Sequence, residues 1–192
     1  MTVCRIQRNN AEERIVRIIE GKSSEKIKNK DEGEGYPADL EEYALDLIRQ
    51  HIARKFKGHR LAYLVEAILQ AEGYFTYRSP EGPDGGVDIL AGRGPLGFDE
   101  PRLAVQVKSG DAPVGGPELN QLRGAMGKLN ARVGLFVSWG GFKGAAEKEK
   151  AQSFFEIRLW DANDLIQALL ANYERLPDDI QAEIPLKRIW IL

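Results

Sequence analysis

Two short segments of the sequence bring together residue types that could hold a divalent metal beside a phosphate. The first covers residues 84–89 (DGGVDI), and the second covers residues 105–108 (VQVK). Alternate residues of a strand share a face, so Gln106 and Lys108 should lie side by side, about 7 Å apart by two strand steps. If the two segments pair as neighbouring strands, Asp88 lies across from them. A carboxylate, an amide and an ammonium group would then form one polar cluster.

Such a cluster suits Mg²⁺. Burying these groups is costly unless a ligand satisfies them, and Mg²⁺ is usually held by one or two carboxylates, phosphate oxygens and water. Asp88 would supply the carboxylate and Gln106 its amide oxygen, while Lys108 would bind the phosphate or the attacking water. Glu66, at the edge of an apolar helix stripe, is expected to reach the same metal directly or through water.

Two further residues have alternatives that the sequence leaves open. Asp84 precedes two glycines, so it either caps a tight turn or supports the site. Lys143 follows a glycine turn at residues 139–142 (WGGF), so it either contacts nucleic acid or only solvates a helix. His51 and His59 lie near helix ends and are interpreted as surface or capping groups rather than metal ligands.

The elements that must position these residues follow from the spacing of the apolar side chains. We expect helices over residues 11–20, 39–57, 59–72, 117–130, 143–153 and 161–173, and strands over residues 74–78, 87–91, 102–108, 133–138 and 156–160. The nearly all-apolar run at 133–138 indicates a central strand covered on both faces. This order predicts an α/β fold that begins with a three-stranded meander and continues with crossovers.

A charged, glycine-rich segment near the N-terminus predicts a division of the chain. Residues 28–37 (KNKDEGEGYP) are poor in apolar side chains, which is typical of a linker or an exposed loop. We therefore expect an N-terminal helical segment over residues 1–57, which we interpret as part of a truncated domain, and an α/β domain over residues 58–192.

Composition excludes several classes of protein. The net charge of -2 excludes a binder coated in positive charge, and the single Cys4 excludes an internal disulfide or a cysteine-based zinc cluster. No apolar run approaches the roughly 18 residues of a membrane helix, and Met1 to Asn10 lack the apolar stretch of a secretion signal. We therefore expect no membrane association and a cytoplasmic location. Residues 92–97 match GxGxxG, but Pro95 interrupts them and a strand follows, which favours a hairpin loop over a dinucleotide site.

Over roughly residues 58–170 the chain resembles the Mrr-type restriction endonucleases, the QxK branch of the PD-(D/E)xK nuclease superfamily. The matching segments occur in the family's order: LVEAIL at 64–69 with GY at 73–74, DGGVDI at 84–89, QVK at 106–108, QLRG at 121–124, and GLFVS at 134–138 followed by GF at 141–142. Two positions depart from the superfamily pattern. Val87 stands where a proline usually precedes the aspartate, and Gln106 replaces the second carboxylate, a replacement characteristic of the Mrr branch.

The resemblance implies a restriction-endonuclease-like fold, with a mixed central β-sheet flanked by α-helices. It also implies Mg²⁺-dependent hydrolysis of DNA phosphodiester bonds, with Mn²⁺ as a substitute metal. The catalytic residues that it implies are Asp88, Gln106, Lys108 and Glu66. The implied metal ligands are Asp88, Gln106, Val107 and Glu66, and Gln121 is a supporting helix residue.

The same resemblance implies partners. The substrate would be double-stranded DNA, foreign or modified, and cutting both strands would require a homodimer at least on DNA. Members of the family commonly carry a separate DNA-reading domain, which does not fit in the first 58 residues, so a separate recognition domain or subunit is expected. Two alternatives remain open: a DNA-binding module that keeps the fold without cleaving, and a junction or repair nuclease on the same scaffold.

Overall fold

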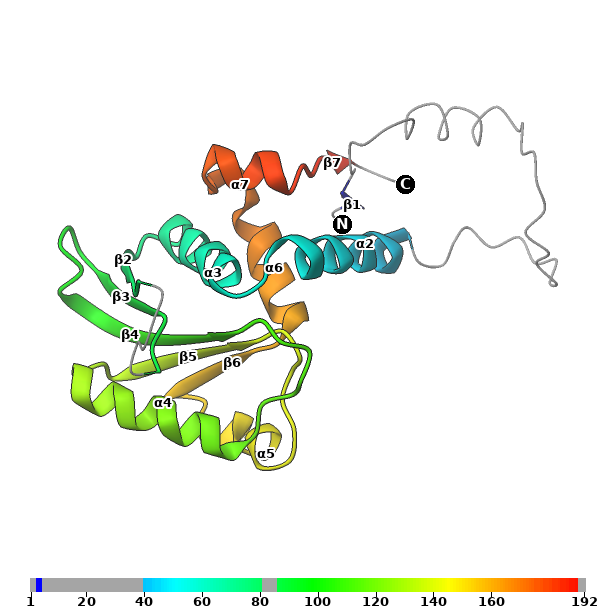
Figure 1. The fold of residues 1–192 in the computed structure, drawn as a ribbon. Helices are drawn as coiled ribbons and strands as arrows, with labels where there is room; N and C mark the ends of the chain where they lie inside the picture. The colour runs from blue at the N-terminus through cyan, green and yellow to red at the C-terminus, as the bar shows by residue number, and fades with distance from the viewer. Residues whose placement is uncertain (1–2, 5–39, 81–85, 190–192) are drawn as a thin grey trace, which may run out of the picture.

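The computed structural model describes residues 3–4, 40–80 and 86–189. In these ranges, helices cover both faces of a mixed β-sheet (Figure 1). The helices are α2 (Leu40–Lys55), α3 (His59–Ala71), α4 (Gly116–Leu129), α5 (Ala145–Gln152), α6 (Ala162–Asn172) and α7 (Asp178–Glu183), with a 3-10 turn η1 (Tyr173–Arg175) after α6. The sheet consists of β2 (Phe75–Arg78), β3 (Ile89–Arg93), β4 (Asp99–Lys108), β5 (Val133–Ser138) and β6 (Ile157–Trp160), and β1 (Val3–Cys4) pairs separately with β7 (Arg188–Ile189).

The strand order in the sheet is β2-β3-β4-β5-β6. Strands β2, β3 and β4 form an antiparallel meander, whereas β4, β5 and β6 run parallel. Parallel neighbours need a crossover, and α4 and α5 supply the two crossovers in this part of the chain. The predicted mixed α/β fold with a meander and crossovers is therefore confirmed.

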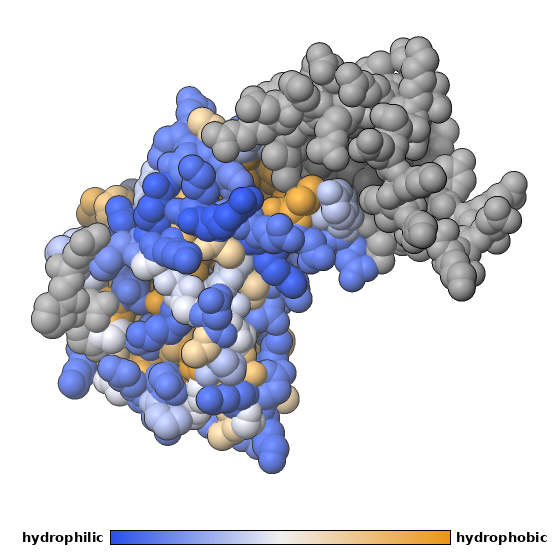
Figure 2. All heavy atoms as spheres, turned by 45° about the vertical axis from the view of Figure 1, so that its right-hand side comes forward, coloured by the Kyte–Doolittle hydropathy of each residue, from blue (hydrophilic) through white to orange (hydrophobic). Residues whose placement is uncertain are grey.

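Two apolar clusters lie on opposite faces of the sheet. The first holds Val105 and Val107 of β4 together with buried residues of α2, α3 and α6. The second holds Ala104 of β4 together with buried residues of α4 and α5, and Figure 1 shows α4 and α5 on this side. Hydrophilic residues cover most of the described surface seen in Figure 2. Strand alternation along β4 therefore decides which side chains face α3 and which face α4.

Local sequence signals place most element boundaries within a few residues. β5 occupies the predicted residues 133–138, and Asp161 caps α6 by accepting hydrogen bonds from the main-chain N–H groups of Asn163 (2.7 Å) and Asp164 (3.0 Å). Strand β4 begins at Asp99, three residues earlier than predicted, because its first residues extend the hairpin with β3. The GxGxxG match is the loop of that hairpin, as expected.

Tyr43 departs from the apolar periodicity of α2, and several predicted elements fall outside the described residues. Tyr43 is 62% exposed, because α2 buries a narrower face that carries Ile48 and Ile52. The helix predicted over residues 11–20 and the linker predicted over residues 28–37 lie outside the described residues. The domain boundary at residue 58 stays a prediction, although Ile48 and Ile52 belong to the same core cluster as α3.

Across the described ranges, no helix is both long enough and apolar enough to cross a bilayer.

The β3–β4 hairpin depends on a close backbone contact at Gly92. A Cβ atom at Gly92 would lie 2.0 Å from the carbonyl oxygen of Gly97, so Gly92→Ala forces the two strands apart. We expect this variant to lower the free energy of unfolding by about 1–3 kcal/mol, as overpacking does, measured by urea denaturation. Gly124→Ala is the matched control. A Cβ there has nothing within 4 Å, so this variant should gain up to about 1 kcal/mol from helix propensity. Equal effects of the two variants would contradict the close contact.

Candidate active site

The Asp88 carboxylate is held against the end of β4. The main-chain N–H of Asp88 donates to the carbonyl oxygen of Val105 (2.8 Å), and its Oδ2 accepts a hydrogen bond from the main-chain N–H of Val107 (2.7 Å). These two bonds lie on either side of Gln106 along the chain. The structure therefore brings Asp88 to the segment that carries Gln106 and Lys108, on the neighbouring strand that the sequence predicts.

The main-chain oxygen of Val107 lies on the same side of β4 as Asp88. In a strand, the N–H and C=O of one residue point to the same side, and the Val107 N–H points to Asp88. The main-chain groups of Lys108, the next residue, point to the opposite side, toward β5. Its carbonyl oxygen accepts a hydrogen bond from the N–H of Trp139 (2.8 Å), the residue after β5. If Val107 ligates a metal, it does so through its carbonyl oxygen, since its side chain is buried in the first apolar cluster.

Gln106 carries an unpaired oxygen in the interior. Its side chain is 2% exposed, and its Oε1 has no hydrogen-bond partner among the described residues. A buried acceptor left without a partner costs about 1–3 kcal/mol. The Gln106 amide, the Asp88 carboxylate that is bonded to the next residue, and the Val107 carbonyl all offer hard oxygen donors, the type that Mg²⁺ prefers. The residues present therefore fit a divalent cation.

Lys108 and Gln121 flank this set of oxygens. Lys108 is exposed at the end of β4, in register with Ser138 of β5. Gln121 is an exposed residue of α4, and a Cβ atom at Gly86 would lie 3.2 Å from its Nε2. The Gln121 side chain therefore reaches the segment just before Asp88, on the face of the sheet that α4 covers. The matching QLRG segment alone did not show this contact.

Of the two residues with open alternatives, one can be placed. Lys143 is exposed, and its main-chain N–H donates to the carbonyl oxygen of Val114 (2.9 Å). Val114 lies in the loop between β4 and α4. Lys143 is therefore located near the C-terminal ends of the parallel strands β4 and β5. Asp84 lies outside the described residues.

Glu66 lies on the other face of the sheet. It is a buried residue of α3, and both of its carboxylate oxygens accept hydrogen bonds from side chains of β2. Oε2 accepts from Nε of Arg78 (2.8 Å), and Oε1 accepts from Oγ1 of Thr76 (3.0 Å). Gln106 shares its face with Ala104, under α4, so Glu66 and Gln106 are separated by the sheet. A ligand role for Glu66 stays a prediction.

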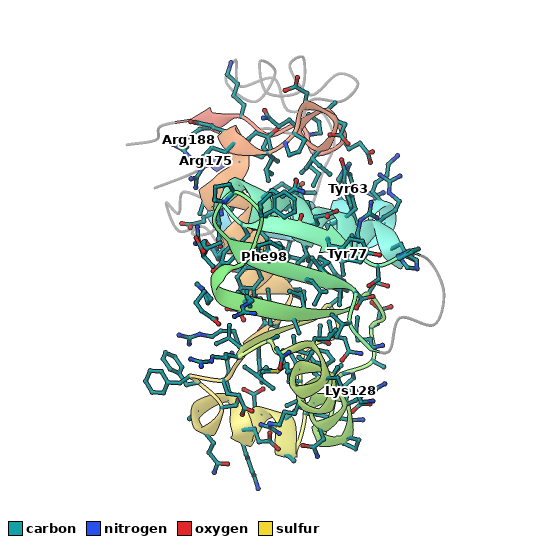
Figure 3. The ribbon with its side chains drawn as sticks, turned by 90° about the vertical axis from the view of Figure 1, so that its left-hand side faces the viewer. Tyr63, Tyr77, Phe98, Lys128, Arg175 and Arg188 are labelled. Atoms are coloured by element: carbon teal, nitrogen blue, oxygen red, sulfur yellow. The ribbon has the colours of Figure 1, made fainter. Side chains whose placement is uncertain are left out.

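Arg78 continues this polar network toward the C-terminal helices. Its guanidinium group lies over the ring of Tyr63, 5.1 Å from the centroid, and the Tyr63 hydroxyl donates to the Asp179 carboxylate of α7 (2.6 Å). Figure 3 shows Tyr63 between α7 and the sheet. The hydrogen bond to Asp179 raises the pKa of Tyr63, and the same bond lowers the pKa of Asp179. The alternation of β2 could have indicated that Thr76 and Arg78 face α3, but not which helix residue they meet.

The fold and the family model agree on the class of protein to which this chain belongs, the restriction endonucleases. Residues 53–169, more than half of the chain, match the restriction endonuclease family model Mrr_cat, so the chain belongs to this family. The Mrr-type resemblance of the sequence is thereby confirmed. No curated protein matches the chain.

Two solved structures are similar to this chain. One is the DNA modification-dependent restriction endonuclease AspBHI, with a TM-score of 0.52 and 17% identity over 83% of this chain and 43% of that one. The other is the MspJI restriction endonuclease in complex with a 27-mer oligonucleotide, with a TM-score of 0.48 and 18% identity over 85% of this chain and 39% of that one. The AspBHI likeness supports the restriction-endonuclease-like fold. This chain spans less than half the length of either enzyme.

Removing the unpaired amide should separate stability from metal binding. Gln106→Leu eliminates the buried acceptor, so the free energy of unfolding should stay level or rise by up to about 3 kcal/mol, measured by urea denaturation. Binding of Mn²⁺, measured by calorimetry, should be lost. The matched control Gln121→Leu changes an exposed glutamine and should alter stability by no more than about 0.5 kcal/mol. A clearly destabilised Gln106→Leu protein would show that the amide is satisfied within the protein itself.

The bond between Tyr63 and Asp179 predicts a pH dependence of stability. Because the Asp179 pKa is lowered, its contribution is present above the ordinary value of 3.8 and is lost as pH falls through the lowered pKa. Because the Tyr63 pKa is raised, its contribution is present below 10.0 and is lost as pH rises through the raised pKa. Tyr63→Phe should therefore reduce Tm between pH 3.8 and 10.0, and the deficit should shrink outside that window. A deficit independent of pH would contradict the bond.

Proposed function

We propose that this chain contains the catalytic domain of a Mg²⁺-dependent DNA endonuclease that acts in restriction of foreign or modified DNA. The observation that carries the proposal is the Asp88 carboxylate, hydrogen-bonded to the N–H of Val107, the residue that directly follows Gln106 with its unpaired buried amide oxygen. Membership of the restriction endonuclease family supports the reaction class. The donor set supports the metal, because all three candidate ligand atoms are oxygens.

In this proposal the metal is held by the Asp88 carboxylate, the Gln106 amide oxygen and the Val107 carbonyl oxygen. Mg²⁺, when bound, supplies Lewis-acid stabilisation of the charge that develops on the phosphate. Lys108, exposed at the end of β4, donates hydrogen bonds from its ammonium group to the phosphate or to the attacking water and so orients the attack. Gln121 supports the site by packing over Gly86.

We propose that double-stranded DNA binds at the C-terminal ends of β4 and β5. Lys108 and Lys143 are both exposed there, and these cations would neutralise phosphates of the substrate. One site cuts one strand, so cleavage of both strands requires two copies of the chain, which favours a homodimer at least on DNA. We propose a cytoplasmic location for this reaction, as the sequence predicts.

Target selection is proposed to reside in a separate recognition domain or subunit. AspBHI is described as modification-dependent, and this chain covers only 43% of that enzyme. We propose that such a reader lies outside the nuclease domain of residues 58–192. Dependence on a modified base is the finer proposal that AspBHI suggests.

Plasmid cleavage with Mg²⁺ tests the site. Asp88→Asn keeps an acceptor for the Val107 N–H but removes the negative charge, and Lys108→Ala removes the ammonium group. We expect each variant to reduce the cleavage rate by about 100-fold or more, as removal of a group that stabilises the transition state does. Lys128→Ala, an exposed lysine of α4, is the control and should cleave normally.

The alternatives predict other results in the same assay. Undiminished cutting by both site variants would remove the site assignment. Salt-sensitive DNA binding with no cleavage and no metal binding by the wild-type chain would favour a non-cleaving DNA-binding module. Preference for branched over linear duplex would favour a junction or repair nuclease.

A further inference from the structure

The ion pair between Glu66 and Arg78 joins α3 to β2. The Glu66 side chain is 11% exposed and the Arg78 side chain is 37% exposed, and the Nε–Oε2 distance is 2.8 Å. An ion pair with one partner exposed to solvent contributes only about 0–1 kcal/mol to stability. Its main effect here is therefore on the orientation of the two elements that it joins.

The remaining bonds of Glu66 fix its orientation. Thr76 donates its hydroxyl proton to Oε1 of Glu66 (3.0 Å), and the same hydroxyl oxygen accepts a hydrogen bond from Nε2 of Gln70 (2.8 Å). With Gln70 as its donor, the Thr76 hydroxyl is directed to donate to Glu66. The carboxylate thus binds β2 at two alternate residues and holds that strand against α3.

The strand held in this way ends beside Asp88. Ser79 directly follows Arg78, and its main-chain N–H donates to the carbonyl oxygen of Asp88 (2.8 Å). Its hydroxyl donates to the carbonyl oxygen of Val87 (2.9 Å). The backbone at residues 87–88 is therefore fixed by Ser79 on one side, while the Asp88 carboxylate is fixed by Val107 on the other.

We propose that Glu66 is a positioning residue: through Arg78 and Ser79 it holds the backbone of Asp88 so that the carboxylate meets the Val107 N–H. The inference rests on the proposed function, since Asp88 matters to catalysis only if this oxygen cluster holds the metal. It replaces direct ligation by Glu66. Both Glu66 oxygens are engaged by β2, Arg78 neutralises the charge, and the carboxylate lies on the α3 face, away from Gln106.

Metal affinity of two single variants and their double variant distinguishes positioning from ligation. Glu66→Gln keeps the shape of the side chain and removes its charge, and Arg78→Met removes the cation. Positioning predicts that each variant weakens Mn²⁺ binding in calorimetry by about 10- to 100-fold, as loss of a group behind a metal ligand does. Because both variants disrupt the same series of contacts, the Mn²⁺ affinity of the double variant should be no lower than that of the single variant with the lower affinity.

Direct ligation predicts a different pattern. If Glu66 bound the metal, Arg78→Met would remove a competing cation, and Mn²⁺ affinity would stay level or rise while Glu66→Gln lowered it. Opposite effects of the two variants would overturn the inference. Arg78→Lys keeps the charge and should recover part of the affinity that Arg78→Met loses.

A second measurement needs neither metal nor activity. The Val107 amide proton is bonded to the Asp88 carboxylate, so its hydrogen exchange, followed by NMR in metal-free protein, reports on the position of Asp88. Both single variants should accelerate this exchange about 10-fold or more relative to the Phe136 amide at the centre of the sheet, since local opening exposes only the amides whose bonds it breaks.

Tyr63→Phe is the matched control for this measurement. It breaks the bond to Asp179 and leaves Glu66, Thr76 and Ser79 unchanged, so the exchange of Val107 relative to Phe136 should match that of wild type. Unchanged relative exchange in both Glu66→Gln and Arg78→Met would overturn the inference. If wild-type protein binds no Mn²⁺, the proposed function fails, but the exchange of Val107 still decides whether Glu66 positions Asp88.

Discussion

The hydrogen bond from the Val107 N–H to the Asp88 carboxylate fixes a side chain at the end of the β3–β4 pairing, between residues 19 positions apart in the sequence. At this point β3 has not yet begun, so a main-chain donor of β4 lacks a strand partner, and a side-chain oxygen takes the place of one. A carboxylate used in this way is pinned at the end of the sheet with its charge beside the main-chain oxygen of Val107. The position of the Asp88 carboxylate, and with it the proposed metal site, depends on this side-chain hydrogen bond.

The amide oxygen of Gln106 is buried without a hydrogen-bond partner among the described residues, which lowers the stability of the isolated protein. Native cores satisfy nearly all buried polar atoms, and the buried residues of α4 on the face of Gln106 are apolar, as is Ala104. An amide oxygen without a partner in the described part of the chain is therefore unfavourable in the isolated protein, and the proposed cation would relieve it. This is the physical reason to regard the glutamine of the QxK motif as a ligand position rather than a packing residue.

The two faces of the sheet carry different groups of polar side chains. On the α4 face lie Gln106 and the Gln121 side chain that packs over Gly86. On the α3 face lie the Glu66 carboxylate and the β2 side chains that bind it. In our proposal the α3 face supplies no metal ligand; it holds the end of β2, where Ser79 bonds to the main chain of Asp88. A rigid support behind a metal ligand preserves geometry that the ligand alone does not.

Periodicity and short motifs in the sequence predicted the mixed α/β fold and the neighbouring positions of Asp88 and the QxK segment. Those features are local: apolar alternation sets which residues share a face, and a glycine or a capping aspartate ends or begins an element. Only the tertiary structure placed Glu66 on the opposite face, paired it with Arg78 and put Gln121 over Gly86. The reason is that strand periodicity assigns a residue to one of two faces, whereas the packing of whole elements decides which helix covers that face.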